Sequence, residues 1–205
     1  MIVVVDYGMG NVGSIANMLR KVGAQPMVSA DPALIAQAHK LVLPGVGAFD
    51  AAMERINGGG LRAALDHRVL EDRVPVLGIC LGMQLLTQRS EEGELRGLGW
   101  VDARTVAFRG RIDAQLKCPH MGWNLVTPQA TSPLTREFDL LEEPRFYFVH
   151  SYFVECAQRE AAILRTTYGV TYDSGLQQGN IYGVQFHPEK SHRFGMKLLE
   201  NFARL

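Results

Sequence analysis

The chain has 205 residues, of which 47% are hydrophobic and 20% are charged, and its 21 basic residues are balanced by 21 acidic ones. These proportions are typical of a globular domain, and they exclude a disordered or low-complexity chain. A protein that binds nucleic acid by neutralising phosphates needs an excess of basic residues, so the zero net charge argues against a nucleic-acid partner.

The N-terminus and the cysteines indicate where the protein works. The opening segment, MIVVVD, has no basic residue and only four apolar residues before its first acidic one, which does not fit a signal peptide. No apolar run approaches the roughly 20 residues that a membrane-spanning helix needs. The chain has an odd number of cysteines, Cys80, Cys118 and Cys156, and contains no CxxC motif, which argues against a disulfide framework. We therefore expect a cytoplasmic protein without a membrane attachment, formed by one domain over residues 1–205.

The first half of the chain alternates short apolar runs with helical patterns. Strands are expected at Ile2–Val5, Lys40–Leu43 and Val74–Ile79, and helices at Val12–Val22, at Leu61–Glu71 and from residue 81 to Leu86. Gly23 is placed to end the first of these helices. Alternation of this kind indicates βαβ units and a parallel sheet covered by helices on both faces.

The second half is richer in strands. They are expected at Trp100–Phe108, Phe146–Glu155, Ile163–Thr167 and Ile181–Phe186, and a last helix is expected from about Ser191 to Ala203, burying Met196, Leu198, Leu199 and Phe202. We infer an α/β fold with a doubly wound, mostly parallel mixed sheet, to which antiparallel pairs are added late in the chain.

The segment Gly78-Ile79-Cys80-Leu81-Gly82 follows a predicted buried strand and precedes a predicted helix. This is the pattern of a nucleophile elbow, in which small residues two positions away on either side let the chain turn sharply and present the central residue. The start of a helix also favours the thiolate form of a cysteine, because free N–H groups stabilise negative charge. A buried structural cysteine is the plainer alternative, but the strand–turn–helix context favours a nucleophile at Cys80.

A thiol nucleophile needs a base and a group that orients the base. His187, at the end of a predicted strand, is the best candidate for the base. In an extended backbone, residues two apart point to the same side, so Glu189 is expected to hold the imidazole while Pro188 stiffens the link. The remaining alternative is a strand-end histidine without a role. Of the other histidines, surface positions are expected for His39 and His67 and structural positions for His120 and His150.

Acyl transfer also needs N–H donors for the developing oxyanion. The elbow itself supplies the N–H group of Leu81. A second donor must come from another loop at the same sheet edge, and Pro44-Gly45-Val46-Gly47 directly follows a predicted strand. Its glycines allow the peptide of Val46 to turn toward the site.

A competing motif lies near the N-terminus. Gly8, Gly10 and Gly13 form a GxGxxG pattern between a strand and a helix, and Asp31 follows at the spacing of the ribose-binding acid in a dinucleotide fold. Asp31 precedes Pro32, however, so it is equally suited to cap a short helix. No set of four ligands with zinc-like spacing exists, and we expect no bound metal.

Taken together, these segments resemble the class I (triad-type) glutamine amidotransferases, which have a flavodoxin-like fold, and the resemblance covers nearly the whole chain. Within this superfamily the chain is most similar to the glutaminase subunits of imidazole glycerol phosphate synthase. The resemblance rests on Asp6–Asn11, Pro44–Gly47, Gly78–Gln84, Pro119–Asn124, Phe146–Tyr152 and Gln185–Ser191. The Met-Gly-Trp-Asn and His-Pro-Glu-Lys-Ser segments argue against the alternative of a glutaminase for anthranilate or aminodeoxychorismate synthesis.

The resemblance implies a reaction and a set of site residues. Cys80 would attack the side-chain amide of L-glutamine to give a thioester and ammonia, with His187 as acid and base and Glu189 orienting it. The oxyanion would be bound by the N–H groups of Leu81 and Val46, the latter flanked by Gly45 and Gly47. The implied substrate-binding residues are Gln84, Glu92, Ser151 and Tyr152. The resemblance implies neither a cofactor nor a metal.

The resemblance also implies a partner chain, since a glutaminase fold fills all 205 residues and leaves no room for a domain that uses ammonia. That partner would be the cyclase subunit, a (β/α)8 barrel in a heterodimer, which receives the ammonia and forms imidazole glycerol phosphate and AICAR in histidine biosynthesis. The residues implied at or near this interface are Asn11, Pro119, Met121, Trp123, Tyr147 and Lys190.

Overall fold

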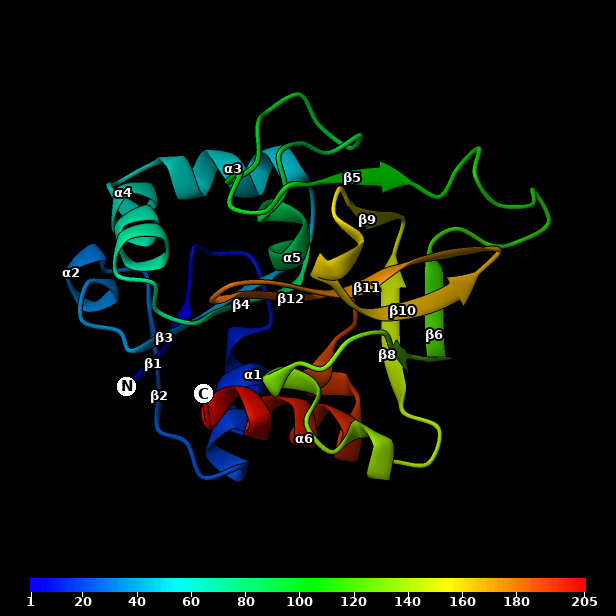
Figure 1. Cartoon of the computed structure of the whole chain (residues 1–205). Helices are drawn as coiled ribbons and strands as arrows, with labels where there is room; N and C mark the ends of the chain where they lie inside the picture. Colours follow the sequence, from blue (N-terminus) through cyan, green and yellow to red (C-terminus); the bar gives the residue numbers. More distant parts are fainter.

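The computed structural model describes residues 1–205 and is built around a ten-stranded mixed sheet (Figure 1). The strands follow one another across it in the order β2 (Pro26–Ser29), β1 (Ile2–Val5), β3 (Lys40–Gly45), β4 (Val76–Cys80), β12 (Ile181–Val184), β11 (Val170–Gln178), β10 (Ala162–Tyr168) and β7 (Thr127–Pro128), with β9 (Tyr152–Cys156) beside β11 and β5 (Ala103–Ala107) beside β9. The pairs from β2 to β12 are parallel, and the later pairs are antiparallel. The predicted α/β fold with a mixed sheet is confirmed.

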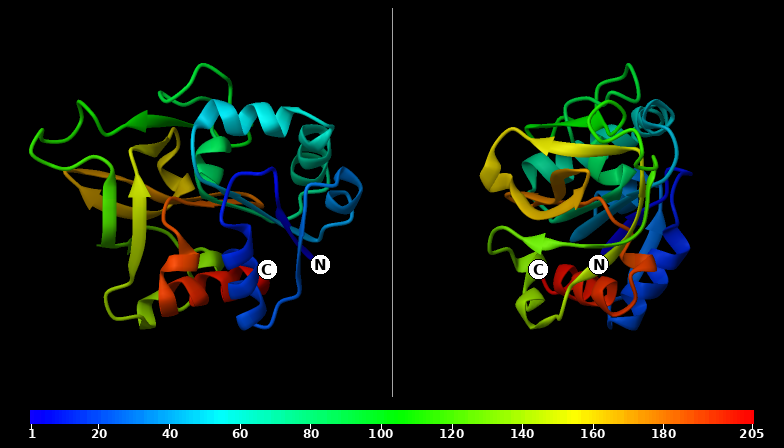
Figure 2. Two further views of the ribbon diagram at one scale, coloured as in Figure 1. Left: turned by 180° about the vertical axis from the view of Figure 1, so that it is seen from behind. Right: turned by 90° about the vertical axis from the view of Figure 1, so that its right-hand side faces the viewer.

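Helices cover both faces of this sheet, which explains why its central strands are apolar without interruption. One face carries α1 (Val12–Lys21) and α6 (His192–Ala203), and the opposite face carries α3 (Phe49–Asn57), α4 (Leu61–Asp66) and α5 (Leu81–Leu85), with the short α2 (Pro32–Ile35) beside α4 (Figures 1 and 2). Alternate residues of β1 join the two hydrophobic clusters: Val4 packs in the cluster of α1 and α6, and Val5 in that of α3 and α4.

A second, two-stranded sheet stands apart from the first and is formed by β6 (His120–Leu125) and β8 (Arg145–His150). The prediction of one strand over Phe146–Glu155 is therefore wrong, because β8 belongs to this small sheet and β9 to the large one. The burial pattern explains the break. Phe146, Phe148 and His150 are buried in alternation, and the alternation then fails, because Ser151 and Tyr152 are both half-buried and Phe153 and Val154 are both buried.

The helices agree with the predicted positions in most respects. The predicted helix at Leu61–Glu71 is α4 continued by the π-helical segment η1 (His67–Glu71). In α6, Leu198, Leu199 and Phe202 are buried as predicted, but Met196 is 38% exposed. The reason is that Met196 lies two residues from both Phe194 and Leu198, which places it on the opposite side of the helix.

Several short elements complete the fold. Short 3-10 segments lie at η2 (Pro133–Thr135), η3 (Phe138–Leu140), η4 (Arg159–Ala161) and η5 (Pro188–Lys190). The longest helix, α6, has 12 residues, and none of the helices has the length and hydrophobicity to cross a membrane.

Candidate active site

Cys80 is the last residue of β4 and lies directly before α5. Its backbone has φ 55° and ψ −111°, a left-handed conformation that costs a non-glycine residue on the order of 1–3 kcal/mol. Both flanking glycines are required by packing: a Cβ at Gly78 would lie 2.7 Å from the carbonyl oxygen of Gly82, and a Cβ at Gly82 would overlap the carbonyl oxygen of Leu43. The predicted elbow is thus present, and its GxCxG spacing follows from the close approach of β4, α5 and β3.

This packing predicts a large stability effect. We expect Gly82→Ala to lower the free energy of unfolding by about 3 kcal/mol or more, because the new methyl group would have to displace backbone. Gly13→Ala is the matched control: this glycine lies in α1 with nothing within 4 Å of its Cβ position. It should gain stability by about 0.5–1 kcal/mol, since alanine is the better helix former. Urea unfolding measures both, and equal effects would show that the elbow is not tightly packed.

His187 and Glu189 form a buried pair. The imidazole Nδ1 of His187 lies 2.9 Å from Oε1 of Glu189, and the two side chains are only 3% and 1% exposed. The prediction of an extended link was wrong, because Pro188–Lys190 form the 3-10 turn η5. This turn is held by β8: the N–H of His187 donates to the carbonyl of Tyr147, and the Ser191 hydroxyl accepts from the N–H of Tyr147. The rigid turn fixes the imidazole as the predicted strand would have done.

The free side of this pair faces the cysteine. His187 Nε2 is buried and makes no hydrogen bond, as expected for a nitrogen kept available for a reacting group. Burial alone lowers the pKa of His187, but the interactions of the imidazole with Cys80 and with Glu189 outweigh burial and raise the pKa to about 10. The arrangement therefore favours the imidazolium form of His187, which carries the proton that a leaving amine needs.

Two glutamines lie next to the cysteine. Gln185 is fully buried, and its Nε2 is 3.7 Å from the Sγ of Cys80. Its Oε1 accepts from Nε2 of Gln84, which also donates to the carbonyl of Tyr152. The sequence prediction included Gln84 and Tyr152 but missed Gln185. The signal for Gln185 was its position two residues before His187, which suggests the same side of the chain.

The other predicted substrate residues lie around this core. Glu92 accepts from the N–H of Phe49, the first residue of α3, and burial raises the pKa of Glu92. Burial, and then the charge of Glu92, raise the pKa of the Tyr152 phenol. The Ser151 carbonyl is already engaged by the N–H of Phe108. Substrate binding by these residues stays a prediction.

The predicted oxyanion loop is adjacent to the nucleophile. Gly45 ends β3 and is the register partner of Cys80 in β4, so Val46 is the first residue beyond that pair. Gly47 has φ 108°, and the hydroxyl of Tyr7 donates to the carbonyl of Pro44. Leu81, the other predicted donor, is the first residue of α5. The loop thus lies at the same sheet edge as the elbow.

The GxGxxG segment packs against this same loop. A Cβ at Gly10 would lie 3.2 Å from the Cβ of Pro44, and one at Gly47 would lie 2.8 Å from the terminal methyl group of Met9. Asp31 caps α2 through its Oδ1, which accepts from the N–H of Ala33 at 2.9 Å. Both halves of the dinucleotide motif therefore have local structural roles.

The residues predicted at a partner interface fall mainly on the small sheet. Met121 and Trp123 of β6 are 61% and 45% exposed. The Trp123 ring meets that of Tyr147 edge-on at 6.3 Å, and Lys190 Nζ lies 5.5 Å from the centre of the Tyr147 ring. We call Met121, Trp123, Tyr147 and Lys190 the β6–β8 surface. Asn11 is exposed at the start of α1, which packs against η5, and Pro119 directly precedes β6.

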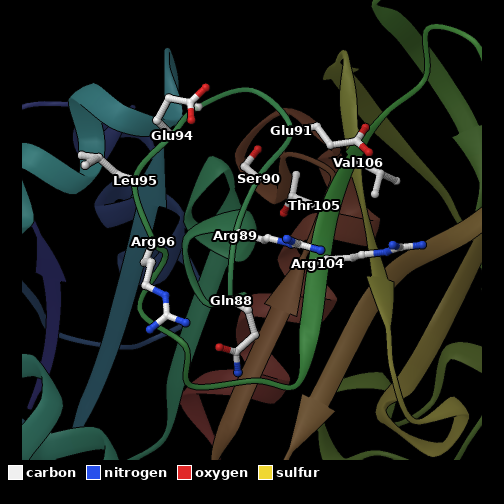
Figure 3. Close-up of a pocket in the computed structure, with 11 residues that line it drawn as sticks. Gln88, Arg89, Ser90, Glu91, Glu94, Leu95, Arg96, Arg104, Thr105 and Val106 are labelled. Atoms are coloured by element: carbon white, nitrogen blue, oxygen red, sulfur yellow. The ribbon is translucent and has the colours of Figure 1, made fainter.

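A cavity of about 640 Å³ lies elsewhere, between the loop Gln88–Arg96 and strand β5 (Figure 3). Its lining is polar and carries charges of both signs, including Arg89, Arg104 and Glu91. It contains neither Cys80 nor His187, and Glu91 is already paired with Arg111. The cavity therefore does not compete with the cysteine site as the place of chemistry.

Two buried histidines complete the surroundings. His120 and His150 are satisfied by hydrogen bonds, as predicted for structural histidines. Burial, opposed by the hydrogen bond to the Tyr152 carbonyl and reinforced by the charges of His120 and His187, lowers the pKa of His150 from 6.5 to about 3. The folded chain therefore leaves His150 uncharged through the whole physiological range.

This shift predicts a pH dependence of stability. Between pH 6.5 and about 3 the unfolded chain protonates His150 while the folded chain does not, so the His150 contribution is complete above pH 6.5 and is lost as the pH falls. From pH 7.5 to pH 5 the loss amounts to about 2 kcal/mol. We expect the difference in unfolding free energy between these two pH values to be smaller by this amount in His150→Gln. Identical pH profiles for variant and wild type in urea titrations would contradict the shift.

Comparison with known proteins agrees with the geometry. The family model of class-I glutamine amidotransferases matches residues 3–205. The structure is similar to that of PurLQS from Thermotoga maritima, with a TM-score of 0.75, 18% identity and coverage of 99% of this chain and 97% of that one. A second solved glutamine amidotransferase has a TM-score of 0.72 at 17% identity and covers 97% of this chain and 99% of its own. The chain belongs to the class-I glutamine amidotransferase family.

Curated relatives narrow this assignment. Subunit HisH 2 of imidazole glycerol phosphate synthase from Methanococcus maripaludis is 50% identical over 204 residues, which cover 100% of this chain and 99% of the relative. Subunit HisH 2 from Pseudomonas aeruginosa is 48% identical over 205 residues and all of both chains. Within the family, the chain therefore groups with the HisH subunits.

Proposed function

We propose that this chain is the glutaminase subunit of imidazole glycerol phosphate synthase and that residues 1–205 form one glutaminase domain. The observation that carries the proposal is the buried triad, in which the unpartnered Nε2 of His187 faces a strained cysteine and Glu189 holds the opposite ring nitrogen. This is the geometry of a nucleophile, a base and an orienting group. The full-length similarity to HisH subunits supports the particular substrate.

The reaction starts with attack of the Cys80 sulfur on the side-chain amide carbon of glutamine. The carbon–nitrogen bond breaks as His187 gives its proton to the nitrogen, which leaves as ammonia. Water, deprotonated by His187, then attacks the thioester carbon, and the carbon–sulfur bond breaks to give glutamate and the free thiol. Glu189 keeps the imidazole oriented through both steps.

Hydrogen-bond donors and residues proposed to bind the substrate surround the reacting atoms. The oxyanion of each tetrahedral intermediate would be stabilised by the N–H groups of Leu81 and Val46. Gln84 and Glu92, with Tyr152 and Ser151 beside them, are proposed to bind the amino-acid end of glutamine. Glu92 is suited to the α-ammonium group because a half-buried carboxylate attracts a cation strongly.

The ammonia requires an acceptor. We propose that this is the cyclase subunit, a (β/α)8 barrel, and that it docks on the β6–β8 surface together with Asn11 and Pro119. Trp and Met are enriched at protein interfaces, and Trp123 and Met121 are exposed on this surface. As expected for an enzyme of soluble metabolites, we place the complex in the cytoplasm.

The test is co-purification with the cyclase, followed by measurement of glutamate release with and without the ribonucleotide ligand of the cyclase. We expect a one-to-one complex whose glutamine hydrolysis rises when that ligand is bound. Trp123→Ala should weaken the complex without changing the fold, whereas Leu140→Ala, at a residue 74% exposed on η3, is the control for loss of an exposed apolar side chain. Absence of a complex with the cyclase would refute the assignment.

A further inference from the structure

A cluster of buried polar side chains lies beneath the β6–β8 surface and is not used by the reaction described above. His120, His150 and Tyr172 are 3%, 6% and 2% exposed. The His120 Nδ1 is 3.1 Å from the Tyr172 hydroxyl oxygen, and that oxygen is 3.2 Å from the His150 Nε2. An apolar core can pack without buried polar groups, so three of them in mutual contact call for an explanation.

The inner end of the cluster fixes the tautomer of His150. Its Nδ1 lies 2.7 Å from the backbone carbonyl oxygen of Tyr152. A carbonyl only accepts, so Nδ1 carries the proton. Since burial keeps His150 uncharged, its Nε2 is a bare acceptor, and it must receive its hydrogen bond from Tyr172 or His120.

The outer end fixes His120 in the same way. Asn124 of β6 accepts from the N–H of Leu125 through Oδ1 and donates to the carbonyl of Thr167 through Nδ2, which settles the orientation of its amide. The same Nδ2 is 3.2 Å from His120 Nε2 and donates to it. His120, whose pKa burial lowers to about 4, is uncharged, so its proton is on Nδ1, which lies 3.1 Å from the Tyr172 oxygen and 3.2 Å from the His150 Nε2.

Assigning the His120 proton to the nearer of its two acceptors, the Tyr172 oxygen, gives one direction of donation through the cluster. Asn124 donates to His120, His120 to Tyr172, Tyr172 to His150, and His150 to the carbonyl of Tyr152. We call this chain of hydrogen bonds the β6 relay. It begins on the strand that carries Met121 and Trp123 and ends at a carbonyl beside the reaction site.

The last carbonyl connects the relay to the nucleophile. Gln84 Nε2 donates to the Tyr152 carbonyl at 3.0 Å and to Gln185 Oε1 at 3.1 Å. With its Oε1 accepting, Gln185 presents its Nε2 to the Sγ of Cys80 at 3.7 Å. A shift of His150 thus changes one of the two acceptors that hold Gln84, and through Gln84 the Gln185 amide that contacts the sulfur.

We propose that Tyr172 and His150 are positioning residues for glutamine hydrolysis. As members of the β6 relay, they couple the position of strand β6 to the position of the Cys80 side chain. The inference rests on the proposed function, because it is the docking of a partner that would displace β6. Neither residue touches the substrate. Each acts through Tyr152, Gln84 and Gln185.

The decisive comparison uses two tyrosines of the same aromatic cluster. Tyr172→Phe removes the central hydroxyl of the relay and keeps the ring. Tyr168→Phe is the matched control, because this ring stacks on His120 at 4.1 Å while its hydroxyl donates to the carbonyl of Lys117 outside the relay. In the cyclase complex with its ligand bound, we expect Tyr172→Phe to lower kcat for glutamine about tenfold. Tyr168→Phe should stay within about twofold of the wild type.

The assay counts active sites, so that a folding defect is separated from a positioning defect. A glutamine-like diazo-ketone titrates reactive Cys80, and kcat is expressed per titrated site, with the melting temperature recorded for each variant. Equal kcat per site for the two tyrosine variants would overturn the proposal. A wild-type complex that does not hydrolyse glutamine would instead refute the proposed function, so the two failures are distinguishable.

The histidine offers a second, independent readout. His150→Asn retains an N–H near the position of Nδ1, whereas His150→Leu removes the donor, so we expect the asparagine variant to recover most of the activity that the leucine variant loses. Nitrogen-15 spectra should show His120 and His150 uncharged and protonated at Nδ1. Protonation of His150 at Nε2, or equal activity of the two variants, would contradict the direction of the relay.

Discussion

Replacement of Cys80 by alanine is expected to abolish glutamine hydrolysis by the complex while ammonia-dependent synthesis by the cyclase continues. Removal of a nucleophile that acts as one unit with its base lowers kcat by a factor of about 10⁴ or more. Cys80 ends β4, which lies between β3 and β12 in the large sheet, and its side chain is 6% exposed. Alanine at this position should therefore leave the β6–β8 surface intact. Glutamate release and product formation from ammonium salts measure the two activities separately.

The other two cysteines are the natural controls. Cys118 is exposed, whereas burial and then the charge of Asp173 raise the pKa of Cys156, which disfavours the reactive thiolate there. One equivalent of a glutamine-like diazo-ketone should label Cys80 alone, as peptide mapping would show, and Cys156→Ala should retain hydrolysis. Loss of both activities in Cys80→Ala would mean that this residue is structural.

Substitution of Val46 by proline is expected to cost about 10²–10³ in kcat, because it removes one of the two N–H groups proposed for the oxyanion. The side chain of Val46 is 46% exposed, so the effect should arise from the peptide rather than from packing. Val46→Ala keeps the N–H and is the matched control, with activity close to the wild type. Steady-state glutaminase assays of both complexes, with the cyclase ligand bound, give the comparison.

The same loop suggests how the activity is regulated. Gly45 and Gly47 flank Val46, and Gly47 has φ 108°, so two orientations of the intervening peptide are sterically accessible. A peptide flip that removes one donor is large enough to act as a switch. We expect the isolated subunit to be nearly inactive and Val46→Pro to lose stimulation by the cyclase ligand. An isolated wild-type subunit as fast as the liganded complex would rule the switch out.

The elbow could be predicted from sequence because its requirements are local. Gly78, Cys80 and Gly82 lie within five consecutive residues, and the steric contacts that demand glycine arise from the turn and from the neighbouring strand. The pairing of His187 with Glu189 was predicted for the same reason, although the backbone between them is a turn rather than a strand. The short-range sequence pattern therefore predicted the contact between the two side chains even though the backbone conformation between them differed.

Features that depend on distant partners were missed. Gln185 has a recognisable position in the sequence, but its contacts with Gln84 and Cys80 join residues about one hundred positions apart. The split of Phe146–Glu155 into two strands depends on which sheet each half joins, and this pairing cannot be predicted from a single apolar run. Helix α3 was also missed, although Phe49, Ala52, Met53 and Ile56 have the helical spacing that predicts it.

The left-handed backbone of Cys80 has a consequence for how such chains diverge. Glycine would relax the strain at φ 55°, so a descendant no longer selected for hydrolysis would become more stable by losing its cysteine. Mutational drift and stability would then act in the same direction, and the thiol would disappear quickly. A cysteine that persists in this conformation is therefore a physical record of continuing selection for catalysis.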